Sequence, residues 1–206
     1  MNYSARGFTV IEMLVSISII GIISAVVLYN YPQFNQEIHM NRAAREVAFA
    51  VRTAQAQAVQ VQEINPALGA PDNYGIQFTK NSNTFTLFTD GLGGVCEDKR
   101  YNASGCTESD HGVTYRLERG VTIEDVTIPD VSGNDISRNE LNVLYYRPDP
   151  ISKVTDGVGG CWAFSDPPPC VSSNGPFKVF IKSADDSVKR EIHIWLTGQI
   201  SIRRGA

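Results

Sequence analysis

Near its N-terminus the chain reads GFTVIEMLVSISIIGIISAVVLY, from Gly7 to Tyr29. From Phe8 onward this run is apolar except for a single charge, Glu12. Its length is close to the ~20 residues that an α-helix needs to cross a bilayer. A secretory signal places its small cleavage-site residue after the apolar core, whereas here Gly7 precedes it. A cut after Gly7 would leave the apolar run on the mature protein, so the stretch predicts a retained membrane helix.

Glu12 is the residue that membrane insertion makes costly. An acidic side chain at mid-membrane costs roughly 2.5–3.5 kcal/mol on insertion scales. One interpretation is a carboxylate near the end of the helix, tolerated at the interface. The other is a carboxylate that waits for a cation. Cleavage after Gly7 would give Phe8 a free α-amine, which is positively charged at pH 7, and the amine of a neighbouring subunit could neutralise Glu12.

The motif GFTVIEML (residues 7–14), followed by an apolar helix, resembles the class III leader of type IV pilins and type II secretion pseudopilins. The resemblance implies that residues 1–7 are a leader peptide, which a prepilin peptidase removes by cutting between Gly7 and Phe8. The same enzyme would methylate the new N-terminal Phe8. In this family the glutamate that corresponds to Glu12 assists alignment with the neighbouring subunit during assembly.

Two helical parts are predicted in sequence, an assembly helix at 8–31 and an amphipathic helix at 32–64 that packs on the head. Small residues in the first part would permit close helix contacts. Pro32 predicts a bend or local melting, and Asn65-Pro66 ends the helix. The second part carries apolar residues at three- and four-residue steps. These are Phe34, Ile38, Ala44, Val47, Ala48, Val51, Ala54, Ala58 and Val61.

Residues 65–206 read as a β-rich globular head, because alternating segments are separated by turn residues. Three longer stretches have no predicted strand: 90–112, a loop that carries the first cysteine pair, 129–139, which is turn-rich, and 154–175, an irregular insert. Thr197-Gly198 is predicted as a two-residue hairpin turn. The strands are expected at 74–79, 84–89, 113–117, 121–128, 141–147, 177–182, 189–196 and 199–203.

One long helix followed by strands predicts an α+β fold with an antiparallel sheet. It is similar to the pilin lollipop, in which a long N-terminal α-helix packs on an antiparallel β-sheet head. The segment from Ile192 to Ile202 resembles the terminal hairpin of the GspH/FimT-type minor pseudopilins, where a glycine turn joins two short strands.

The four cysteines, Cys96, Cys106, Cys161 and Cys170, form two pairs close in sequence. Four cysteines allow three connectivities, and local pairing closes the shortest loops. A zinc site is the alternative, but the sequence has no C-x-x-C and no nearby histidine pair. Disulfides would place the head in an oxidising compartment outside the cytoplasm.

No enzyme motif is found, and no cofactor is predicted. His39, His111 and His193 are scattered, and His193 alternates with isoleucines, which predicts a strand surface residue. The sequence after Asp90 could suggest calcium, as in the loops of some pseudopilins, but its spacing matches no EF-hand.

Nucleic acid is the remaining alternative. The net charge of −4 does not favour it,, but the chain is basic from Phe177 onward. Some FimT-type minor pilins of natural competence bind DNA through arginines after a terminal glycine. The loosely corresponding candidates here are Lys189, Arg190, Arg203 and Arg204. A solubilising terminus is the competing interpretation.

The sequence therefore predicts a minor pilin or pseudopilin rather than an enzyme. It would stand in the inner membrane as a single-pass protein with its head in the periplasm or outside the cell. It would then join a type IV pilus or a type II secretion pseudopilus. Its expected partners are other pilins or pseudopilins, prepilin peptidase and inner-membrane lipid, with loops Asp90–Gly112 and Val154–Gly175 presented to further partners. A tip-located DNA-binding minor pilin is the alternative.

Overall fold

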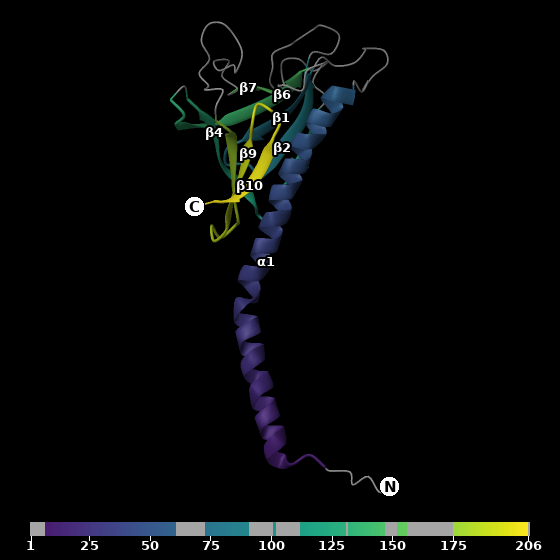
Figure 1. Cartoon of the computed structure of the whole chain (residues 1–206), viewed down its shortest axis with the longest axis vertical. Helices are drawn as coiled ribbons and strands as arrows, with labels where there is room; N and C mark the ends of the chain where they lie inside the picture. The colour runs from purple at the N-terminus through teal and green to yellow at the C-terminus, as the bar shows by residue number, and fades with distance from the viewer. Residues whose placement is uncertain are drawn as a thin grey trace. The chain divides into compact units, whose positions relative to one another are not determined.

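The computed structural model describes residues 7–60, 73–90, 101, 112–130, 132–146, 152–155 and 175–205. Over these residues one long helix precedes ten strands, and all paired strands are antiparallel (Figure 1). This confirms the α+β fold class. The elements are α1 (Val10–Gln60), β1 (Asn73–Thr79), β2 (Thr84–Asp90), β3 (Gly112–Arg116), β4 (Thr122–Pro129), β5 (Asp135–Arg138), β6 (Glu140–Tyr146), β7 (Ser152–Thr155), β8 (Phe177–Lys182), β9 (Lys189–Ile194) and β10 (Ile200–Arg204).

The helix is one continuous element through position 32, so the local melting predicted at Pro32 does not occur. A proline removes one backbone donor from a helix, and α1 continues on both sides of it. Two compact units divide the chain inside this helix, one up to Ile38 and one from His39 onward. The C-terminal half of α1 thus belongs to the same unit as the strands.

Within the described residues, the head contains two five-stranded sheets rather than a single one. The first sheet has the order β3-β2-β1-β6-β7, and the second has the order β10-β9-β8-β4-β5. The turn between β1 and β2 joins them, because the amide of Asn81 donates to the carbonyl of Ile123 at 2.8 Å and the amide of Ile123 donates to the carbonyl of Ser82 at 2.7 Å. The two sheets are therefore linked by backbone hydrogen bonds as well as by a common core.

The core lies between α1 and the two sheets. The helix contributes Met40, Ala43, Ala44, Val47, Ala50, Val51, Ala54 and Ala58. Small alanines allow the backbone of the helix to approach the strands closely. Figure 1 shows this half of α1 lying along the strands.

The predicted apolar stripe was too long at its N-terminal end. Phe34 is 64% exposed and Ile38 is 48% exposed, while Ala48 is only half-buried. Phe34 and Ile38 precede His39, where the compact unit around the sheets begins. Val61 lies outside the described residues.

Three strand predictions need correction. The turn-rich stretch contains β5, which pairs with β4, and the predicted irregular insert begins inside β7, which pairs with β6. The terminal hairpin has a three-residue loop, because Trp195 donates its amide to Gln199 at 2.9 Å and pairs with it. Gly198 closes this loop with φ +81°, as expected for a hairpin with a left-handed residue before its second strand,.

Tyr101 is the one described residue between positions 91 and 111. Its ring centroid lies 5.8 Å from that of Phe88, and a Cβ on Gly112 would be 2.5 Å from the Tyr101 ring. Its carbonyl accepts a hydrogen bond from the Gln77 side chain at 3.4 Å. These contacts fix this point of the predicted loop against the outer face of the first sheet.

Candidate functional site: the exposed N-terminal helix

The first part of α1 is an apolar surface with no cover among the described residues. Every large hydrophobic side chain from Phe8 to Tyr31 is at least half exposed. Within the described chain, α1 is the one helix long and apolar enough to cross a membrane by length and composition. An apolar patch of this extent needs a lipid or protein environment. Lipid and neighbouring helices are therefore the environments that its composition fits.

The start of α1 gives Glu12 a local role that the sequence reasoning missed. The side-chain oxygen of Thr9 accepts a hydrogen bond from the amide of Glu12 at 3.3 Å. Thr9 thus acts as N-cap, and Glu12 occupies the third helical position of a T-x-x-E capping pattern. A carboxylate in the first turn also interacts favourably with the positive end of the helix dipole. The T-x-x-E spacing in the sequence was the signal for this role.

The hydroxyl groups of the apolar run are satisfied inside the helix. Ser16 donates to the carbonyl of Glu12 and Ser18 to the carbonyl of Leu14, both at 2.8 Å. Such back-bonding leaves no unsatisfied donor on these residues to face hydrocarbon. A Cβ on Gly21 would meet nothing within 4 Å, so this position offers space for another helix,.

Gly7 lies just before the helix and is exposed. A Cβ at this position would also meet nothing within 4 Å, and its φ lies outside the range that favours glycine. Neither packing nor backbone conformation therefore requires glycine at position 7.

Comparison with known proteins identifies this N-terminal segment. Residues 2–28 match the family described as the prokaryotic N-terminal methylation motif. The chain carries the type IV pilin signature. Two curated relatives, both named fimbrial protein and both from Pseudomonas aeruginosa, are 30% identical to it over 78 residues. This alignment covers 37% of the chain and 51% of each relative, so the chain spans about half the length of the curated relatives it matches.

No solved structure matches the chain. The type IV pilin signature covers the residues on which the sequence resemblance was based, and neither match describes an enzyme. Both findings concern a pilin-like protein in general, and neither distinguishes a minor GspH/FimT-type member.

The predicted basic residues near the C-terminus do not form one surface. Arg190 is buried, and its Nε donates to Oδ1 of Asn41 on α1 at 3.0 Å. Lys189 pairs with Glu124 at 2.9 Å. Arg203 and Arg204 are exposed on β10. Lys189 and Arg190 are therefore engaged within the head.

The lysines around these residues are also paired. Lys178 forms an ion pair with Asp135, and Lys182 pairs with Asp186 at 2.7 Å. The hydrogen bond that Lys182 donates to Asp186 raises the pKa of Lys182. This pairing of lysines with carboxylates reduces the positive potential that the composition of the C-terminal segment suggested.

His193 is not the surface residue that alternation predicted. It is 4% exposed, its Nε2 lies 3.0 Å from Glu191 Oε2, and its ring packs against Trp195 with centroids 5.8 Å apart. Alternation along a strand determines the face of the sheet but does not reveal whether that face is covered.

Several predicted residues lie outside the described residues. These are the four cysteines, with both the disulfide and the zinc interpretations, the glycine-rich sequence after Asp90, and His111. Within the described part of the chain, no group of three or more acidic, histidine or cysteine side chains could hold a metal ion.

Proposed function

We propose that this chain is a subunit of a type IV pilin-like filament, either a pilus or a type II secretion pseudopilus. Residues 8–31 would anchor it in the inner membrane and then pack among the helices of other subunits. The observation that supports this most directly is the N-terminal methylation motif over residues 2–28, on a helix whose apolar side chains are exposed. A surface of this kind is costly in water, and both lipid and a bundle of like helices would cover it.

Processing would occur between Gly7 and Phe8, with methylation of Phe8. The exposure of Gly7 supports access by a prepilin peptidase. Since a Cβ there meets open space, replacing Gly7 by a larger residue should leave the fold unchanged. Loss of cleavage in such a variant would then report on recognition by the peptidase alone.

Glu12 would accept the α-amine of Phe8 from a neighbouring subunit. In the membrane both charges would be costly alone, and pairing would offset their desolvation. The capping interaction with Thr9 offers a competing, purely local reason for a glutamate at this position. The two roles differ in what they require, because capping tolerates glutamine at the third helical position whereas charge pairing does not.

A variant series at the start of α1 tests this proposal. We expect Glu12→Gln and Glu12→Ala to be processed normally but to be poorly incorporated into filaments beside the wild-type protein. Thr9→Ala is the matched control, because it removes the N-cap and keeps the charge, so it should still be incorporated. Normal incorporation of Glu12→Gln, with a defect confined to Glu12→Ala and Thr9→Ala, would show that capping explains the glutamate.

The minor GspH/FimT-type role and the exported head with disulfides at Cys96, Cys106, Cys161 and Cys170 belong to the same proposal. They draw support from the terminal hairpin with Gly198 and from the cysteine spacing. DNA binding is not proposed as a second function, since Arg190 is buried and Lys189 is paired.

A further inference from the structure

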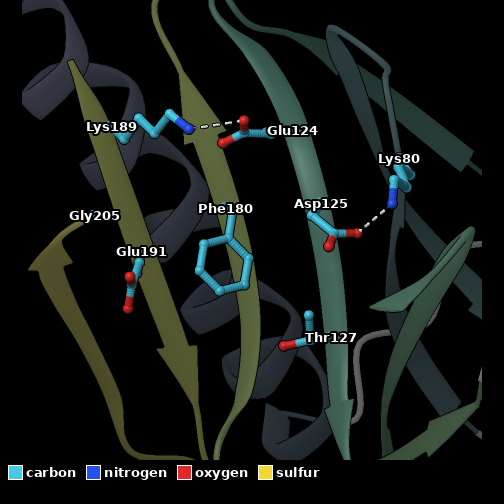
Figure 2. A pocket seen from close by; sticks show the side chains of 8 residues that line it. All are labelled: Lys80, Glu124, Asp125, Thr127, Phe180, Lys189, Glu191 and Gly205. Carbon is cyan, nitrogen blue, oxygen red and sulfur yellow. Dashed lines mark hydrogen bonds and ion pairs between the residues drawn. The ribbon is translucent and has the colours of Figure 1, made fainter. Parts of the chain in front are cut away.

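A pocket of about 490 Å³ lies on the second sheet, far in sequence from the assembly helix. Its walls come from β4, β8 and β9, with Lys80 and Gly205 at its margins (Figure 2). The lining residues are Lys80, Glu124, Asp125, Thr127, Phe180, Lys189, Glu191 and Gly205. All of them belong to the compact unit that begins at His39.

Ion pairs hold the charged walls in place. Lys80 Nζ lies 2.9 Å from Asp125 Oδ1, and Lys189 Nζ lies 2.9 Å from Glu124 Oε1. Ser137 donates to the same Asp125 oxygen at 2.6 Å. Within the described residues, each of these two carboxylates is bonded through one oxygen, which leaves its second oxygen as a free acceptor. The ion pairs therefore hold the charged side chains of the pocket in fixed positions and leave carboxylate oxygens that can accept hydrogen bonds from a ligand.

Glu191 is the third carboxylate of the lining, and among the described residues neither lysine of the pocket forms an ion pair with it. One of its oxygens contacts His193 Nε2 at 3.0 Å. Arg203 is its cross-strand neighbour on β10, but no ion pair joins the two side chains in the described part of the chain. Two lysines against three carboxylates give the lining one excess negative charge at neutral pH.

A buried hydroxyl without a partner also lines the pocket. Thr127 is 5% exposed, and its Oγ1 has no hydrogen-bond partner. A buried polar group without a partner costs about 1–3 kcal/mol. Figure 2 shows its oxygen on the side of the pocket where Phe180 lies. A bound donor would satisfy it.

Phe180 provides an apolar platform between these acceptors. On the ladder it is the cross-strand partner of Asp125 on one side and of Glu191 on the other. Neighbours across strands present their side chains on one face, and Figure 2 shows the ring between the two acids. An aromatic face flanked by carboxylates attracts a cation through both the ring quadrupole and the charges.

We propose that this pocket binds an arginine side chain presented by another polypeptide. A guanidinium group is flat enough to stack on Phe180, and its five donors can reach acceptors on several walls at once. Free arginine carries the same guanidinium together with an α-ammonium and an α-carboxylate. Its α-carboxylate would be repelled by the three carboxylates of the lining, whereas the backbone amides of a polypeptide are uncharged. The proposal does not depend on the filament role, because none of the lining residues belongs to the assembly helix.

Binding is tested on the full chain in detergent micelles by ligand-observed NMR. The probes are acetyl-Gly-Arg-Gly-amide and the same peptide with citrulline, which keeps the shape but loses the charge. We expect the arginine peptide to bind at millimolar concentration and the citrulline peptide to bind at least several-fold more weakly. Free arginine should also bind more weakly than the arginine peptide.

Three variants locate the binding. Glu191→Gln and Phe180→Leu should each weaken the arginine peptide about three- to tenfold, in line with the loss of one charged or aromatic contact. Asp186→Asn is the control, since this exposed carboxylate lies outside the pocket. Equal binding of the citrulline peptide, or unchanged affinity in Glu191→Gln with an unchanged thermal midpoint, would overturn the proposal. If free arginine binds more tightly than the arginine peptide, the proposal that the ligand is an arginine side chain of a polypeptide is wrong.

Discussion

Replacing Gly198 by alanine tests the contact between α1 and the terminal hairpin. Gly198 has φ +81°, and its carbonyl accepts a hydrogen bond from Gln55 Nε2 at 3.0 Å. A Cβ at position 198 would lie 2.8 Å from that same nitrogen. The Gln55 side chain would have to move away, and its hydrogen bond to the turn would be lost.

Two costs combine in this variant. A non-glycine residue in the left-handed region costs roughly 1–2 kcal/mol, and a lost hydrogen bond costs about 0.5–1.5 kcal/mol. The free energy of unfolding of the head should therefore fall by about 2–3 kcal/mol. For a domain of this size that corresponds to a decrease in Tm of roughly 4–12 °C.

Gly133→Ala is the matched control, because Gly133 has a similar φ of +85° but a Cβ there would meet nothing within 4 Å. The free energy of unfolding of Gly133→Ala should fall only by the cost of placing a non-glycine residue in the left-handed region. Thermal unfolding of the full chain in detergent, followed by circular dichroism, measures both variants. In a Gln55→Ala background, Gly198→Ala should cost no more than Gly133→Ala does. Equal decreases in the free energy of unfolding for Gly198→Ala and Gly133→Ala in the wild-type background would refute the contact between Gln55 and the terminal hairpin.

Two further predictions concern the hydrophobic core and the stability of the head at alkaline pH. Because Met40 is fully buried, Met40→Ala should reduce the free energy of unfolding by about 2–5 kcal/mol in denaturant titrations,. Phe49→Ala is the control and should change the free energy of unfolding by less than about 0.5 kcal/mol, since Phe49 is 71% exposed,. Burial raises the pKa of the Tyr145 phenol. The folded state therefore keeps a proton that the unfolded state loses, so stability should be complete below about pH 10 and fall above it, as measured by alkaline unfolding. Tyr145→Phe should remove this contribution, and an unchanged alkaline profile would contradict it.

Local patterns explain what the sequence predicted correctly. The methylation motif is a continuous stretch around Gly7, Phe8 and Glu12, so no tertiary information is needed to find it. The hairpin of β1 and β2 was also predictable, because two alternating segments flank Asn81, which adopts φ +59° in the turn. Asparagine tolerates this conformation better than most residues.

Edge strands and long-range pairing explain what was missed. The strands β5 and β7 are short and lie at sheet edges, and the exposed pattern of β5 carries no alternation of apolar residues. The division into two sheets depends on the pairing of β4 with β8, which are separated by several other strands. Such pairing is determined by tertiary packing rather than by local propensity.

The same dependence on tertiary packing explains which residues of the candidate site and the pocket could not be predicted from the sequence. Arg190 has the composition of a surface cation, yet it lies on the side of β9 that faces α1 and bonds to Asn41. The capping role of Glu12 was readable from T-x-x-E spacing, whereas the pocket around Phe180 required the cross-strand register of three strands. Residues brought together by a sheet cannot be grouped before the register is known.

The most direct test of the filament-subunit proposal is the intact mass, with N-terminal fragmentation, of the protein recovered from membranes of cells that contain an active prepilin peptidase. We expect a mature chain that begins with methylated Phe8. A chain that still begins with Met1 in those cells would contradict it, because Glu12 would then have no processed α-amine to pair with.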